Sequence, residues 1–415
     1  MNEPIVVSAP GKAIIFGEHA VVYGKTAIAA SVGLRTFALL NPTRDGKVAL
    51  VFSDIGFQQS WALQDLEPAK KLFVRDGGSF SHPTPISDAV RDQLASLLSV
   101  DPASSQGRAA IAFLYLYIGI SDALISAEVT IRSLLPVGAG LGSSASFSAC
   151  VAAGLLVAFN RIPNSSSGTH SAWSTNETNL TNEWAFMAEK VIHGNPSGID
   201  NSVCVHGGAI LYQKGKPLEQ LVGFTSLRFL ITNTRVPKDT LVQVANVAKR
   251  REKYPDIFNH VIDAVQGVSR ACIEAVERFE ASRKLPSDRS DLYNTIEFLI
   301  DTNQTLLVSL GVSHASLENV RSIGQRYGVT TKLTGGGGGG CAITVVRDDF
   351  PASKIENLLT DLTSQGYEGF VATVGCPGVL SHNVTDVREL LRVGDALTSA
   401  EFLKADLEPV QKSVA

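Results

Sequence analysis

The sequence is poor in the features that mark secreted, membrane-bound and metal-stapled proteins. It has five cysteines among 415 residues, none in a C-x-x-C pair, so neither a disulfide framework nor a zinc site is indicated, and we expect five buried thiols. The longest apolar run, AAIAFLYLYIGI at 109–120, is well short of the roughly 20 residues that cross a bilayer. The opening MNEPIVVSAPGK lacks the basic and apolar regions of a signal peptide.

An excess of positive charge is also lacking. The chain has 36 Lys and Arg against 40 Asp and Glu, for a net charge of −4, which argues against a nucleic-acid or membrane surface. We therefore expect a cytoplasmic protein that binds a small molecule, with no nucleic acid and no membrane as partner.

The chain does contain many apolar residues. They make up 44% of the sequence, which is enough for two hydrophobic cores. We place a domain boundary near residue 225, giving domains 1–225 and 226–415. Periodicity predicts a mixed α+β fold, with a strand at 127–133 that leads into a helix from 143 to about 160. Further helices are expected near 85–98, 107–120, 241–252, 256–282, 289–310 and 352–365.

The middle of the chain contains a polar segment and then a short amphipathic helix. Residues 163–182 are rich in Ser, Thr and Asn and are expected to form a surface excursion. In the next helix the period places Glu189 away from the apolar stripe, facing solvent or a cleft. His193 is expected to cap carbonyls where that helix ends at Gly194.

The stretch LLPVGAGLGSSASFSAC, residues 134–150, crowds glycines and serines at the start of a helix. Such an elbow can direct several backbone N–H groups at one anion, so it predicts a phosphate cradle, whereas an empty tight turn is the alternative. It lacks the lysine of the Walker pattern. It also matches G-x-G-x-x-G poorly, because position 143 is serine.

Three separated segments together resemble the motifs of the GHMP kinase family, named for galactose, homoserine, mevalonate and phosphomevalonate. They are PGKAIIFGEHAVVYGK at 10–25, the elbow, and KLTGGGGGGCAI at 332–343. One departure is Gly336, where the family commonly has alanine. The resemblance implies an N-terminal domain with a left-handed βαβ unit, a ferredoxin-like C-terminal domain, and an active site in the cleft between them.

The resemblance also implies roles for individual residues. Asp200 would be the catalytic base and Lys12 the cation beside it, while Ser144 and Glu189 would bind Mg²⁺. ATP would contact Gly138, Gly140, Leu141, Gly142, Ser143, Ser144 and Phe147, and the substrate would contact Glu18, His19, Ser197, Thr240 and Gly337.

Taken singly, these residues keep ordinary alternatives. Lys12 could be a surface lysine, Glu189 a solvated helix residue, Asp200 a helix N-cap and Phe147 a core residue. The joint occurrence of the motifs is what favours the catalytic interpretation.

The strings GEHAVVYGK and EKVIHGNPSGIDN resemble the branch that acts on mevalonate. They imply ATP- and Mg²⁺-dependent phosphorylation of (R)-mevalonate to (R)-5-phosphomevalonate in isoprenoid and sterol biosynthesis. A homodimer and feedback inhibition by prenyl diphosphates are further implications. The alternatives are a sister kinase such as one for phosphomevalonate, a lyase that decarboxylates diphosphomevalonate, and a non-catalytic metabolite sensor.

Overall fold

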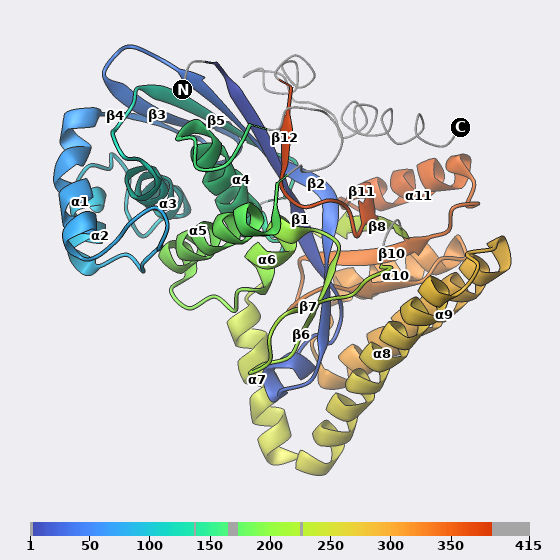
Figure 1. Cartoon of the computed structure of the whole chain (residues 1–415). Coiled ribbons are helices and arrows are strands. Elements are labelled where there is room, and N and C mark those ends of the chain that lie inside the picture. Colours follow the sequence, from blue (N-terminus) through green and yellow to red (C-terminus); the bar gives the residue numbers. More distant parts are fainter. Residues whose placement is uncertain (1–2, 137, 165–172, 225–226, 384–415) are drawn as a thin grey trace.

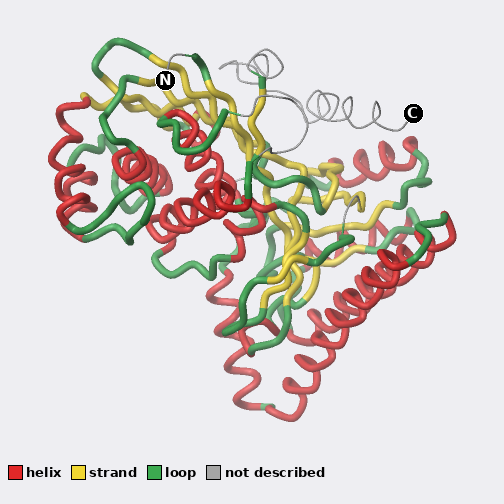
Figure 2. Tube along the Cα trace, viewed as in Figure 1, coloured by secondary structure: helices red, strands yellow, loops and turns green. Residues whose placement is uncertain are grey.

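The computed structural model describes residues 3–136, 138–164, 173–224 and 227–383 (Figure 1). Within these ranges the strands join in one mixed sheet, whose main path runs β4-β3-β5-β2-β11-β8-β10-β9. Figure 2 shows the strands as a band through the middle of the molecule with helices at both ends. The strands are β1 Ile5–Phe16, β2 Ala27–Pro42, β3 Lys47–Phe52, β4 Phe57–Ala62, β5 Ala127–Ser133, β6 Ala209–Tyr212, β7 Glu219–Gln220, β8 Leu227–Asn233, β9 Thr331–Leu333, β10 Cys341–Val346, β11 Glu368–Val374 and β12 Leu380–His382.

The helices divide between the two ends of this sheet. Helices α1 to α6 lie at the end that holds β3, β4 and β5, and α8 and α9 run side by side at the other end (Figure 1). The helices are α1 Leu63–Arg75, α2 Asp88–Ala95, α3 Ser105–Ile120, α4 Ser143–Ala158, α5 Thr175–His193, α6 Ile199–His206, α7 Thr240–Lys253, α8 Pro255–Ala281, α9 Pro286–Leu310, α10 Ala315–Arg326 and α11 Ala352–Ser364, with short 3-10 turns η1 Ala20–Tyr23 and η2 Ser53–Ile55. None of the helices in the described ranges is long and apolar enough to cross a membrane.

The long antiparallel pair of β1 and β2 connects two hydrophobic cores. Its Val7 and Leu40 belong to a core formed with α3, α4 and α5, and its Ile15 and Ile28 belong to a second core formed with β8, β10, α8 and α9. Because one ribbon enters both cores, the loops at its ends are held in place by packing on both sides.

Most of the expected elements are confirmed. The strand at 127–133 is β5, the elbow opens into α4, and the expected helices near 85–98, 107–120, 241–252, 256–282, 289–310 and 352–365 are present with ends shifted by a few residues. All five cysteines are free and buried. The division at residue 225 stays a prediction.

The expectation of a polar excursion over 163–182 is wrong at its C-terminal end, because α5 already begins at Thr175. Ser174 and Glu177 form a reciprocal capping box there, which satisfies two N–H groups at the helix start and stabilises a helix in polar sequence. Residues 165–172 of the segment lie outside the described residues.

Candidate active site

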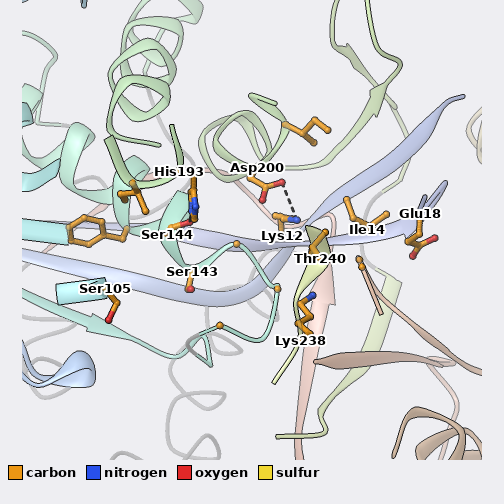
Figure 3. Close-up of a pocket in the computed structure, with 18 of the residues that line it drawn as sticks. Lys12, Ile14, Glu18, Ser105, Ser143, Ser144, His193, Asp200, Lys238 and Thr240 are labelled. Atoms are coloured by element: carbon orange, nitrogen blue, oxygen red, sulfur yellow. Dashed lines mark hydrogen bonds and ion pairs between the residues drawn. The ribbon is translucent and has the colours of Figure 1, made fainter. Parts of the chain in front are cut away.

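A cavity of about 600 Å³ brings together all three sequence segments (Figure 3). The first segment contributes through β1 and the turn after it, the elbow through the start of α4, and the third segment through the loop between β9 and β10. The polar and glycine residues that line the cavity include Lys12, Glu18, His19, Ser105, Arg108, Ser133, Gly138, Gly140, Gly142, Ser143, Ser144, His193, Asp200, Lys238, Thr240, Gly335 and Gly336.

An ion pair lies in the middle of the cavity. Lys12 Nζ, from β1, is 3.0 Å from Asp200 Oδ1, from the first turn of α6 (Figure 3). The lysine side chain is 10% exposed and the aspartate side chain 38%, so the carboxylate stays open to the cavity while its partner is largely shielded. The arrangement allows Asp200 to take a proton from a bound hydroxyl, with Lys12 compensating the charge before the transfer.

The elbow presents the start of α4 to the cavity. Gly138, Gly140 and Gly142 have φ values of 73°, 86° and 72°. Glycine adopts this left-handed conformation readily because it has no Cβ, and the turn can therefore run close along the cavity wall. No side chain caps α4, so its first N–H groups are available to an anion.

Two lysines lie against this elbow. A Cβ built on Gly140 would lie 1.8 Å from Lys238 Nζ, and one built on Gly142 would lie 2.7 Å from Lys12 Cγ. The helix N-terminus and the two ammonium groups together form a site suited to the phosphates of a nucleotide.

Glu189 is buried in α5 and faces α4. Ser148 Oγ donates to Glu189 Oε1 at 3.0 Å, and Ser144 Oγ donates to Oε2 at 3.3 Å. Burial, and then the negative charge of Asp200, raises the pKa of Glu189 from 4.5 to about 8. This carboxylate therefore faces the cavity side of α4 with two hydroxyl partners, and His193 Nε2 lies 3.9 Å from its Oε2.

His193 does not cap the end of α5 as expected. Its Nε2 lies 3.0 Å from Ser144 Oγ, because the last turn of α5 brings the ring over the start of α4 and away from its own carbonyls. Burial lowers the pKa of His193, which favours the neutral ring beside the elbow.

The opposite end of the cavity is formed by the first and third segments. His19 Nε2 lies 2.9 Å from the Gly336 carbonyl oxygen, and burial lowers the pKa of His19. Thr240, the first residue of α7, lies against Gly336, since a Cβ on that glycine would be 2.7 Å from Thr240 Oγ1.

Glu18 adjoins this end of the cavity, but its carboxylate is turned into the protein. Lys332 Nζ donates to Glu18 Oε1, and both side chains have 0% exposure. Asn303 Nδ2 donates to Oε2 at 3.0 Å. Glu18 therefore lines the cavity with its main chain and not with its carboxylate.

Three residues predicted to contact ligands do not line the cavity with their side chains. Ser197 is exposed, and its hydroxyl accepts from the Ile199 N–H. Gly337 is buried against the carbonyl of Val312. Leu141 is buried in the second core, and its carbonyl accepts from Lys12 N at 2.8 Å.

The far end of the cavity is apolar. Phe147 stacks on Phe52 with ring centroids 5.4 Å apart, and Ile55, Ala109 and Ile192 complete this wall. Flat apolar surfaces of this kind suit a nucleoside base. Ser105 and Arg108, at the start of α3, also line this end, and the sequence analysis missed both.

Lys238 is the most important residue that the sequence analysis missed. It lies just before α7 and points into the cavity between the elbow and the glycine loop (Figure 3). Burial, and then repulsion by Lys12, lowers its pKa. The string TRVPKDT offered a signal, because it places two basic residues immediately before a helix, but only the fold shows which of them faces the cavity.

Comparisons with known proteins agree on one family. The profile of the GHMP kinases N terminal domain matches residues 108–208. Mevalonate kinase of Bos taurus is 39% identical over 399 residues, covering 95% of this chain and 99% of its own. Mevalonate kinase of Homo sapiens is 40% identical over 395 residues, covering 93% and 97%.

Solved structures agree on the fold. The Methanococcus jannaschii mevalonate kinase matches with a TM-score of 0.62 at 23% identity, covering 88% of this chain and 97% of that one. The L. major mevalonate kinase in complex with R-mevalonate matches with a TM-score of 0.62 at 20% identity, covering 89% and 96%. The fold is thus the GHMP kinase fold, and the identities to the curated relatives over nearly the full length show that the chain belongs to the mevalonate kinase family.

Proposed function

We propose that this enzyme transfers the terminal phosphoryl group of ATP to the primary hydroxyl of (R)-mevalonate, giving (R)-5-phosphomevalonate and ADP. The observation that carries the proposal is the ion pair of Lys12 and Asp200, which lies beside the elbow in the same cavity. A hydroxyl bound at Asp200 would face phosphates bound at the start of α4, as phosphoryl transfer requires.

In the proposed mechanism Asp200 accepts the proton of the attacking hydroxyl. The new bond forms between that oxygen and the γ-phosphorus, the bond to the bridging oxygen of ADP breaks, and its electron pair leaves with ADP. Lys12 pairs with the Asp200 carboxylate beforehand and afterwards faces the charge that spreads over the transferred group.

The phosphates are held by the elbow and by Lys238. The N–H groups at the start of α4 and the Lys238 ammonium group lie on the same side of the cavity. Their fixed positions stabilise the negative charge of the nucleotide without reorganisation during the reaction. Phe147 and Phe52 would place the base at the apolar end.

Ser144 and Glu189 are the residues that would hold Mg²⁺. The donor set fits the ion, because a hydroxyl and a carboxylate are hard oxygen ligands and Mg²⁺ typically binds one or two protein groups together with substrate phosphates. The burial of Glu189 also fits, because the basic group beside it is His193, whose Nε2 lies 3.9 Å from Glu189 Oε2 and whose pKa is lowered by burial. When bound, Mg²⁺ would neutralise charge on the β- and γ-phosphates.

The acceptor would lie at the end formed by His19, Thr240 and the glycine loop. Thr240 can donate a hydrogen bond to its oxygens, whereas the neutral His19 ring, whose Nε2–H faces the Gly336 carbonyl, can accept one at Nδ1. Ser197 and Gly337 remain proposed substrate residues, but they would act through the loops they belong to, since neither lines the cavity.

The test is coupled ADP release with purified protein, Mg²⁺ and ATP, comparing mevalonate with phosphomevalonate, diphosphomevalonate, homoserine and galactose. We expect turnover with mevalonate alone. Turnover with another acceptor would favour a sister kinase, release of free phosphate with diphosphomevalonate would favour the lyase, and ATP binding without any turnover would favour the sensor.

Three implications of the resemblance are carried forward as predictions. They are a homodimer, inhibition by prenyl diphosphates in competition with ATP, and a cytoplasmic location. Sedimentation, inhibition kinetics at varied ATP, and cell fractionation test them separately.

A further inference from the structure

A fully buried ion pair lies behind the acceptor end of the cavity, and the mechanism above does not use it. Glu18 and Lys332 are 314 positions apart, and both side chains have 0% exposure. Asn303 of α9 completes the cluster through its 3.0 Å bond to Glu18. We call these three residues the clamp.

The charged groups of the clamp have further hydrogen-bonding and aromatic partners. Besides Glu18, the Lys332 ammonium group donates to the Leu333 carbonyl at 2.8 Å and lies 5.7 Å from the centroid of the Phe16 ring. Desolvation of two charges makes a buried pair a poor source of stability, compared with apolar side chains of similar size. Its retention therefore calls for another reason.

The backbone on either side of Glu18 indicates a reason for the buried pair. His19 has φ 60° and ψ −42°, a conformation that is strained for a residue with a side chain and that persists only where its surroundings hold it. Gly17 on the other side has φ 92°. Glu18 is the residue between these two unusual conformations, and the clamp fixes it.

The strained turn is linked to the glycine loop at the same place. His19 Nε2 contacts the Gly336 carbonyl, four residues after Lys332. Thr334 Oγ1 accepts from Ile14 N at 3.0 Å and donates to Ile14 O at 2.8 Å. The clamp thus lies directly behind two loops that must keep a fixed distance for His19 and Gly336 to form one wall.

We propose that the buried pair of Glu18 and Lys332 is a positioning device, which holds His19 and the glycine loop in the geometry that receives the acceptor. This inference rests on the proposed function, because it assigns that end of the cavity to the acceptor. Neither Glu18 nor Lys332 is a catalytic residue, since their charged groups reach neither substrate nor nucleotide.

The test compares Glu18→Gln, Lys332→Met and the double variant with a remote control. The matched control is the pair of Arg347 and Glu297, 2.5 Å apart and partly buried far from the cavity, changed to Met and Gln. Steady-state constants for both substrates are measured at a temperature where circular dichroism shows every variant to be folded.

We expect the acceptor KM of all three clamp variants to rise about tenfold or more while the ATP KM stays within about threefold. Both constants should stay near the wild-type values in the control. The double variant, which has no unpaired buried charge, should regain thermal stability relative to the single variants but not the acceptor KM. Recovery of the acceptor KM together with stability, or an equal rise in both KM values, would overturn the proposal.

Asn303→Leu keeps the test decisive if the charge variants do not fold. It removes one bond to Glu18 without leaving a bare charge, and the Asn303 Oδ1 atom already lacks a partner, so the variant should fold. A rise of about threefold in the acceptor KM alone supports the clamp, and an unchanged acceptor KM overturns it. If the wild type uses another alcohol, the proposed function is wrong, and the same comparison with that alcohol decides the clamp.

Discussion

Replacing Gly142 by alanine should separate the geometry of the active site from the stability of the fold. Gly142 is the N-cap of α4, with φ 72° and ψ 34°. A Cβ there would lie 2.7 Å from Lys12 Cγ, 3.4 Å from Cε and 3.6 Å from Cδ, so it meets the lysine along most of its length.

The lysine cannot avoid this Cβ by moving its main chain. Lys12 N is bonded to the Leu141 carbonyl at 2.8 Å, and β1 is paired with β2 on one side. The side chain must therefore shift, and Lys12 Nζ will leave its position 3.0 Å from Asp200 Oδ1. Because misplacement of a reacting group by about 1 Å can cost about 100-fold in rate, we expect kcat to fall by about that factor.

The stability cost has a matched control. Alanine in the left-handed region costs about 1 to 2 kcal/mol wherever it stands. Gly46, in the turn between β2 and β3, has the same φ of 72° and no atom within 4 Å of an added Cβ. Gly46→Ala should therefore lose only the part of the stability that the left-handed backbone costs in Gly142→Ala, without the contact with Lys12, and should keep wild-type kcat.

The assay is coupled ADP release together with urea unfolding for both variants. If Gly142→Ala keeps kcat within about threefold of the wild type, or if both variants lose activity to the same degree, then the contact between the elbow and Lys12 does not set the catalytic geometry, and the argument fails.

Local sequence patterns were sufficient to predict the elbow and several single elements, but not how distant side chains pair. The glycine and serine pattern of the elbow and the apolar run after it predict the turn and α4, because both signals are local. The same holds for β5, whose alternation is complete within seven residues. The assembly of the three motifs came from the resemblance.

Pairings between distant residues had no local signal. Glu18 was expected to contact substrate, yet its carboxylate pairs with Lys332 inside the protein. Periodicity placed Glu189 off the apolar stripe but left solvent and cleft open, and only the packing of α5 on α4 shows that it is buried against Ser144 and Ser148. A helical period specifies a face and not the neighbour of that face.

Helices α1 and α10 and the start of α5 are among the features that were missed, and each has an identifiable reason. Helix α1 contains Pro68 and α10 contains Gly324, residues that argue against helices on propensity alone and are tolerated here because apolar faces pack on the core. The start of α5 lies in polar sequence, so the composition predicted a loop there. The capping box of Ser174 stabilises the helix start instead.

Three further changes test individual groups of the site. Asp200→Asn should lower kcat by about 1,000-fold or more while ATP binding, followed by calorimetry, stays near the wild-type value, and near-normal turnover would remove Asp200 from the mechanism. Lys238→Met should raise the ATP KM by about tenfold, because a buried cation beside the elbow is lost, whereas an effect on the acceptor KM alone would place Lys238 at the other substrate. Glu189→Gln should stabilise the metal-free protein at pH 8 but not below pH 5, as measured by urea unfolding with a chelator present.

The sign of this last effect follows from the raised pKa of Glu189. The folded protein holds the proton up to about pH 8, whereas an unfolded chain releases it near 4.5. Between these values the folded state binds more protons, so the free energy of unfolding contributed by Glu189 is fully present below pH 4.5 and falls as the pH rises towards 8. At about 1.4 kcal/mol per pH unit, the loss at pH 8 is on the order of 4 kcal/mol. Glutamine has no proton to lose, so the stability gained by the variant should grow with pH across this window. A gain that is the same at pH 5 and pH 8 would show that Glu189 is ionised throughout this range. Burial of the ionised carboxylate would then not lower the stability of the metal-free protein, and a bound cation would have no such penalty to remove.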